Sequence, residues 1–144
     1  MTLPAARLDL RDERGSVAVE TAVIAPALVL LLLLVVFAGK VSEADGNVTR
    51  AASEAARAAS LRQHSGDAAE DAKRVARENL SASGVPCIAL DVRVDTSDFE
   101  PGGTVAVDLR CTASMADVAL LGVPGQRTFS ATAVEVIDTH RSGP

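Results

Sequence analysis

Glu20 is the ionisable residue whose surroundings are least compatible with a charge. It opens a run, Thr21–Gly39, that contains no charged residue and consists mostly of Val, Leu, Ile and Ala. An ionisable group at the edge of such a run costs free energy unless it reaches an interface or meets a compensating group. Glu20 therefore either marks the start of a membrane interface or has a charge-pairing role.

Cys87 and Cys111 are the other residues with reactive potential, and both lie in the C-terminal half of the chain. An even number of cysteines after a membrane span is typical of a disulfide formed outside the cytoplasm. We expect Cys87 and Cys111 to be bridged. Two buried free thiols are the alternative.

The remaining polar residues form no recognisable catalytic or metal-binding set. His64 and His140 have no Cys or carboxylate at the spacing of metal ligands, so we expect no metal and no cofactor. Gly102–Gly103 lacks the Lys-Ser or Lys-Thr pair and the following helix of a phosphate-binding loop. The acidic stretch 95–100 lacks the spaced oxygen ligands of a calcium loop and is interpreted as a solvated turn. We therefore predict a protein that is not an enzyme and has no small-molecule substrate.

The apolar run is long enough to cross a membrane. At about 1.5 Å per residue, a helix over residues 16–39 spans the roughly 30 Å hydrocarbon core. The Val, Leu and Ile residues at its centre favour insertion. Pro26 cannot donate a hydrogen bond to the carbonyl of Ala22, so we expect a kink in the helix there.

The start of this run resembles a known family. The segment Glu13–Pro26, with Gly15 and Glu20 five residues apart, is similar to the N-terminus of TadE-like proteins. These are minor pilins or pseudopilins of the tight adherence (Flp-type IV) pilus system. The resemblance implies cleavage by a prepilin peptidase between Gly15 and Ser16. It also implies that Glu20 pairs with the free amine of a neighbouring subunit, which fits the need of a carboxylate in lipid for compensation.

The resemblance also implies a layout and a set of partners. Residues 1–15 would be a cytoplasmic leader, 16–39 the single span, and 40–144 an extracytoplasmic domain that functions at the cell membrane or in a surface pilus. Three arginines precede the span and Lys40 and Arg50 follow it, a weak charge bias for a cytoplasmic N-terminus. The expected partners are the membrane, the peptidase, other pilin or pseudopilin subunits and the assembly platform. Nucleic acid is not expected, because the net charge is −5 and no basic cluster is present.

Two other interpretations remain open for the apolar run. It is a secretory signal peptide if it is cut after Ala38, in the sequence Val36-Phe37-Ala38. It is a plain anchor if nothing is cut. In both cases the rest of the chain is a secreted or membrane-anchored binding module.

The segment after the span has a helical pattern followed by a strand pattern. Residues 41–63 are rich in Ala at helical spacing and predict a helical stalk that continues the span, with a possible bend or stop at Gly46–Asn47. A second helix is predicted over 67–83, with Asp67 as its N-cap and Gly84 as its stop. Met115–Gly125 is an apolar turn or short helix that lies on the sheet or dips toward the membrane surface.

Alternating apolar residues predict strands over 88–94 and 105–111, with a third and less regular strand over 128–136. The fold class is therefore α+β, with a small antiparallel sheet of about three strands. Cys111 shares a face with Leu109, whereas Cys87 falls on the face opposite Ile88, so a regular hairpin would hold the thiols apart. A bridge then requires either that Cys87 precede the strand, after Pro86, or a bulge. The three Phe are the only aromatic residues, because the chain has no Trp or Tyr. The core must therefore be built from Val, Leu, Ile and Ala.

Overall fold

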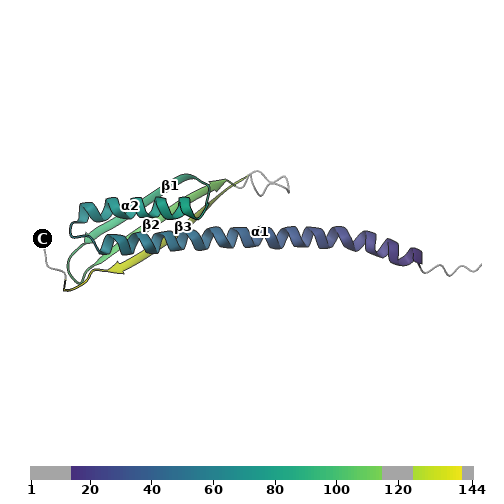
Figure 1. Ribbon diagram of the computed structural model, residues 1–144, viewed down its shortest axis with the longest axis horizontal. Coiled ribbons are helices and arrows are strands. Elements are labelled where there is room, and N and C mark those ends of the chain that lie inside the picture. Colours follow the sequence, from purple (N-terminus) through teal and green to yellow (C-terminus); the bar gives the residue numbers. More distant parts are fainter. Residues whose placement is uncertain (1–13, 115–124, 141–144) are drawn as a thin grey trace, which may run out of the picture. The chain divides into compact units, whose positions relative to one another are not determined.

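The computed structural model describes residues 14–114 and 125–140 and divides the chain into two compact units, Met1–Gly39 and Lys40–Pro144. The element order is α1, α2, β1, β2, β3, as Figure 1 shows. The predicted α+β class is confirmed. The predicted segment Met115–Gly125 falls, but for its last residue, outside the described residues.

Helix α1 (Arg14–Ser60) contains the whole apolar run and continues past it. The helix does not stop at Gly46–Asn47, where an interruption was expected. A glycine in a helix interior costs about 1 kcal/mol. Burial offsets this cost, because Val41, Ala44 and Val48 pack against the core on either side of Gly46. The helix also continues through Pro26.

Helix α2 (Ser65–Ala82) begins two residues earlier than the sequence predicted. Its N-cap is His64, which makes no side-chain capping hydrogen bond, so the prediction that Asp67 caps the helix is wrong. Asp67 lies in the first turn instead, where a carboxylate is favourable beside the helix dipole. The stop is as predicted: Gly84 has φ +70° and follows the C-cap residue Ser83.

Strands β1 (Cys87–Asp98), β2 (Thr104–Ser114) and β3 (Gln126–Val136) form one antiparallel sheet in that order. On the central strand β2, Val105, Val107 and Leu109 are fully buried, and the residues between them are not. One face of the sheet thus packs against the helices. The other face is mostly polar, with Thr112 and Thr128 hydroxyls 3.0 Å apart, although Val134 and Val136 are exposed on it.

The first hairpin has a shorter loop than predicted, because β1 continues to Asp98. Only residues 99–103 connect the strands. The turn depends on Gly102, which has φ +85°, and on the Asp98 carboxylate, which accepts a hydrogen bond from the Thr104 N–H at 3.2 Å.

The core of the C-terminal unit is built mainly from small residues. Both helices contribute alanines that are completely buried, and the sheet contributes Val, Leu and Phe129. Small side chains allow helix and sheet backbones to approach closely. The fully buried alanines are Ala51, Ala52, Ala55, Ala56 and Ala59 of α1 and Ala68, Ala72 and Ala76 of α2.

Candidate functional site

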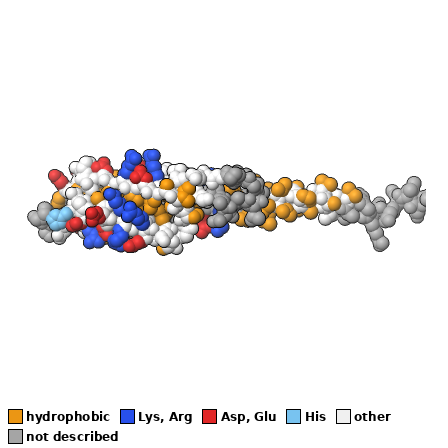
Figure 2. All heavy atoms as spheres, turned by 90° about the horizontal axis from the view of Figure 1, so that it is seen from above, with side chains coloured by type: hydrophobic (Ala, Val, Ile, Leu, Met, Phe, Trp, Pro, Cys, Tyr) orange, Lys and Arg blue, Asp and Glu red, His pale blue; other side chains and the backbone are white. Residues whose placement is uncertain are grey.

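The N-terminal part of α1 displays an apolar surface that no described residue of its own unit covers. Most large apolar side chains from Val19 to Val36 are about half exposed or more, and Leu33 is partly buried. Within the described residues, α1 is the one helix long and apolar enough to cross a membrane. Figure 2 shows hydrophobic side chains along this part of the helix, and Lys, Arg, Asp and Glu side chains over the C-terminal unit. A surface of this size needs lipid or partner helices around it.

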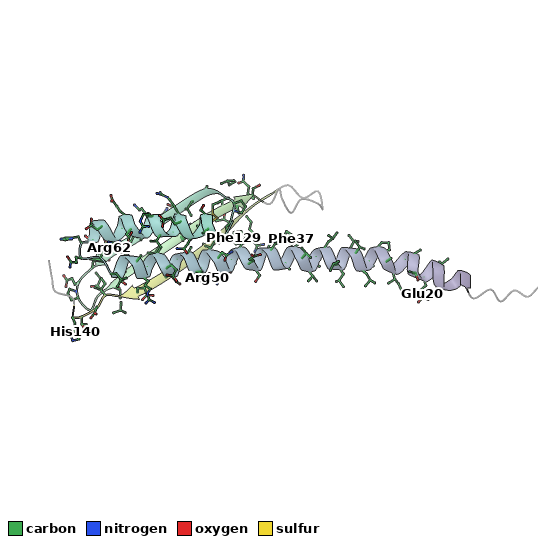
Figure 3. The ribbon with its side chains drawn as sticks, in the orientation of Figure 1. Glu20, Phe37, Arg50, Arg62, Phe129 and His140 are labelled. Atoms are coloured by element: carbon green, nitrogen blue, oxygen red, sulfur yellow. A yellow bond between two sulfur atoms is a disulfide. The ribbon has the colours of Figure 1, made fainter. Side chains whose placement is uncertain are left out.

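Glu20 lies near the N-terminal end of this apolar surface and its side chain is exposed (Figure 3). Between Val19 and Gly39, a range that the structure describes in full, it is the sole charged residue. Gly15 and Ser16 lie in the first turn of α1, because the helix begins at Arg14. Gly15, Ser16 and Glu20, the residues predicted for processing and assembly, therefore all lie near the N-terminal end of α1.

Cys87 and Cys111 form the disulfide that the sequence predicted, with their Cα atoms 5.4 Å apart. The geometric conflict is resolved by a bulge. Cys87 pairs with Ala113 and Ala89 with Thr112, so Ile88 is the extra residue. The bulge turns Cys87 to the face of Leu90 and Cys111, and it leaves Ile88 55 % exposed. The predicted inward position of Ile88 is therefore wrong.

An ion-pair network at the turn between the helices was missed in the sequence. Asp71 Oδ2 lies 2.6 Å from Arg62 Nη2, and its other oxygen accepts hydrogen bonds from Arg74. Arg74 Nη1 also donates to Glu78 Oε2 at 2.7 Å. The spacing of three residues from Asp71 to Arg74 and of four to Glu78 would have indicated this part of the network. The network connects Arg62, which follows the end of α1, to Asp71 of α2.

The bound guanidinium groups set the charge state of Asp71. The Arg74 side chain, together with Arg62, holds the pKa of the Asp71 carboxyl below its usual value despite partial burial. A carboxyl with a lowered pKa in the folded state stabilises the fold above its unfolded pKa of about 3.9, and this contribution is lost as the pH falls through the folded pKa.

We expect Asp71→Asn to lower the free energy of unfolding at neutral pH, because both arginines lose their carboxylate. The difference from the native chain should shrink as the pH falls below the unfolded pKa of about 3.9, and it should disappear once the pH is below the lowered pKa of folded Asp71, where protonation removes the same charge. Hydrogen exchange of α2 amides at pH 7 and at pH 3 measures this difference in the free energy of unfolding. Glu70→Gln, at an exposed site on the same helix, is the control. A difference that is the same at both pH values would contradict the assignment.

The other polar residues do not converge on a site. Among the described residues, no group of three or more His, Cys, Asp or Glu side chains is placed to hold a metal ion. His64 and His140 each lie 3.6 Å from one aspartate. The Asp95 carboxylate accepts a hydrogen bond from the Ser97 N–H at 2.9 Å, and this bond lowers the pKa of Asp95. Two carboxylates of the acidic stretch, Asp95 and Asp98, thus accept hydrogen bonds from nearby backbone N–H groups.

These features define a small α+β protein with one helix suited to span a membrane and a disulfide-linked domain after it. A family model described as TadE-like protein matches residues 15–57, from the first turn of α1 almost to its end. This match confirms the resemblance inferred from Glu13–Pro26. No curated protein and no solved structure matches the chain. The family match points to a protein associated with the Tad pilus.

Proposed function

We propose that this chain is a non-enzymatic structural or assembly subunit of a tight adherence (Flp-type IV) pilus. Prepilin peptidase cuts after Gly15, and the mature chain assembles through its N-terminal helix with other pilin or pseudopilin subunits and the assembly platform. The apolar helix lies in the cell membrane with the N-terminus in the cytoplasm. The domain from Lys40 onward lies outside.

The observation that carries this proposal is Glu20 at the start of an exposed apolar helix. A carboxylate placed in lipid is tolerated only when a positive group compensates it. Cleavage between Gly15 and Ser16 creates such a group, the new α-amino group of Ser16. On an adjacent helix of a second subunit this amine can meet Glu20, so the pair forms only when subunits assemble.

The orientation is supported by the redox state of the domain. Cys87 and Cys111 are bridged, and stable disulfides form in oxidising compartments outside the cytoplasm. Arg7, Arg11 and Arg14 on the other side of the apolar run agree with a cytoplasmic N-terminus. Gly15 also suits a peptidase, because a residue without a Cβ lets the enzyme approach the backbone closely.

The intact mass of the chain from native membranes tests the processing step. We expect a mature protein that starts at Ser16. A chain that starts at Gly39 would support a secreted module, and an intact Met1 chain would support a plain anchor. Either result would overturn the proposed processing.

Glu20→Ala tests the assembly step. We expect incorporation into assemblies to fall roughly tenfold or more, because the amine of the neighbour is left in lipid without a counter-charge. Membrane insertion should persist, since the apolar run is unchanged. Glu54→Ala, in the same helix but beyond the span, is the matched control. Unchanged assembly of Glu20→Ala would contradict the charge-pairing role.

A further inference from the structure

Strand β3 has an edge with no neighbouring strand among the described residues. β3 lies at one edge of the sheet and pairs with β2 over its whole length without a register shift. Proteins commonly protect such edges with Pro, Lys, a bulge or an inward-pointing charge. Within β3, Gln126–Val136, there is no Pro, no Lys and no bulge. Its charged residues are Arg127 and Glu135 alone.

The backbone pattern shows which residues of β3 offer hydrogen bonds to a partner. The Ile137 N–H donates to the Gly103 carbonyl at 2.9 Å, toward the β2 side. Backbone groups alternate in direction along an antiparallel pair, so odd-numbered residues of β3 bond to β2. The even-numbered residues, with Ser130 and Thr132 at the centre, direct their N–H and C=O groups to the free edge.

We propose that β3 pairs antiparallel with β3 of a second copy of this chain, with Ala131 on the two-fold axis. This register overlaps the whole strand, 126 with 136. It also sets the even-numbered residues of the two copies opposite one another as hydrogen-bonded pairs, as the free edge requires. Shifting the register by two residues in either direction keeps that alternation but shortens the overlap.

The side chains on the helix-facing side agree with this register. Pairing about Ala131 places Arg127 of each copy opposite Glu135 of the other, twice per dimer. Phe129 comes to lie opposite Ala133, so a large side chain meets a small one. Both are non-hydrogen-bonded positions, where cross-strand side chains are closest.

Among the described residues, neither of these charges forms an ion pair with a group of opposite sign. Glu135 is half-buried on the helix-facing side, opposite Val105, and takes part in no ion pair among the described residues. Arg127 lies over the Phe129 ring, 5.6 Å from its centroid, and is exposed. A half-buried carboxylate gains most from a counter-charge. The second copy supplies one at each end of the paired strands.

The pairing dictates which chains can meet. In Figure 1 the Lys40–Ser60 part of α1 and strand β3 run in the same general direction. The two-fold axis reverses this direction, so the two Lys40 residues, to which the apolar segments are attached, lie at opposite ends of the dimer. Since the apolar segment is a membrane anchor in the proposed function, the pairing joins chains held in facing membranes, not neighbours in one membrane.

Charge-swap variants of the full chain in phosphatidylcholine vesicles test the proposal. Vesicles that carry the native chain should aggregate, measured by light scattering. R127E and E135R vesicles should each aggregate roughly tenfold more slowly, because like charges then face each other. A mixture of R127E vesicles with E135R vesicles should recover the native rate. R93E, on the polar face of β1, is the control. Failure of the mixture to recover would overturn the register.

A single cysteine at the axis gives a readout that needs no membrane. In detergent micelles, A131C should form an intermolecular disulfide, since its two copies lie directly opposite, and S130C should not. No A131C cross-link would overturn the pairing itself. A cross-link in micelles without vesicle aggregation would overturn the facing-membrane arrangement. Neither result depends on cleavage at Gly15 or on Glu20, so failure here is distinct from failure of the proposed function.

Discussion

Replacing Cys87 and Cys111 together by alanine is expected to lower the free energy of unfolding of the C-terminal unit by about 3 kcal/mol. The cysteines are 24 residues apart in sequence. Closing a loop of this length removes about that much conformational freedom from the unfolded chain. Hydrogen exchange of the β2 amides measures the change. The native chain with a thiol reductant is the matched control and should lose a similar amount. Unchanged protection in both would contradict the prediction.

The same variant is expected to change the position of Ile88. Its alternation with Leu90, Val92 and Val94 favours a register without the bulge, in which Ile88 faces the helices. The disulfide opposes this register, because it requires Cys87 on that face. Once the bridge is removed, burial of the exposed Ile88 side chain favours the regular strand.

Methyl NMR resolves this change, because the chain has isoleucine only at positions 24, 88 and 137. A soluble paramagnetic agent should broaden the Ile88 signal in the oxidised chain and spare it in the double alanine variant. Ile137, which is fully buried, is the internal control in both. An Ile88 methyl that stays accessible while Ile137 stays protected would show that the bulge does not depend on the disulfide.

The features that the sequence predicted are those with a repeated pattern. The apolar run, the alanine spacing of residues 41–63 and the alternation on β1 and β2 each give one answer for helix or strand. The stop at Gly84 was predictable because it requires a left-handed residue. The disulfide could be predicted as well, and a bulge was one of the two geometries that would permit it.

The features that failed depend on interactions between elements. Continuation of α1 through Gly46 results from packing of Val41, Ala44 and Val48 on a core that the local sequence does not contain. The outward position of Ile88 follows from a covalent bond across two strands. The Asp71 network requires Arg62, nine residues away and outside either helix. Propensity and periodicity carry no information on such contacts.

The placement of the candidate assembly residues on one helix could be predicted for a different reason, while their roles stay a prediction. Gly15, Ser16 and Glu20 are close in sequence and lie near one end of the same helix. Their relative positions therefore follow from helical spacing alone. The β3 edge was not identified, because its openness follows from the order of strands. Only the structure shows that β2 is central and that β3 has no second neighbour among the described strands.

Leu109→Ala is expected to cost about 3 kcal/mol of the free energy of unfolding. Leu109 is fully buried on the central strand and is among the largest fully buried side chains of the described residues. It lies between Val92 of β1 and Ala131 of β3. Because its neighbours are β-branched or very small, they cannot move into the space that the leucine leaves. The truncation therefore leaves a cavity in addition to the lost apolar contact.

Hydrogen exchange of β2 and β3 amides in the full chain is the measurement, since the sequence has no Trp or Tyr to report unfolding by fluorescence. Leu61→Ala is the matched control, because the Leu61 side chain is 74 % exposed just after α1. It should change the free energy by less than about 0.5 kcal/mol. The total stability of a domain of this size is only about 5–15 kcal/mol, so the loss at Leu109 should make the fold depend on the Cys87–Cys111 bridge. If Leu109→Ala cost no more than Leu61→Ala, the sheet would not form the core against which the helices pack.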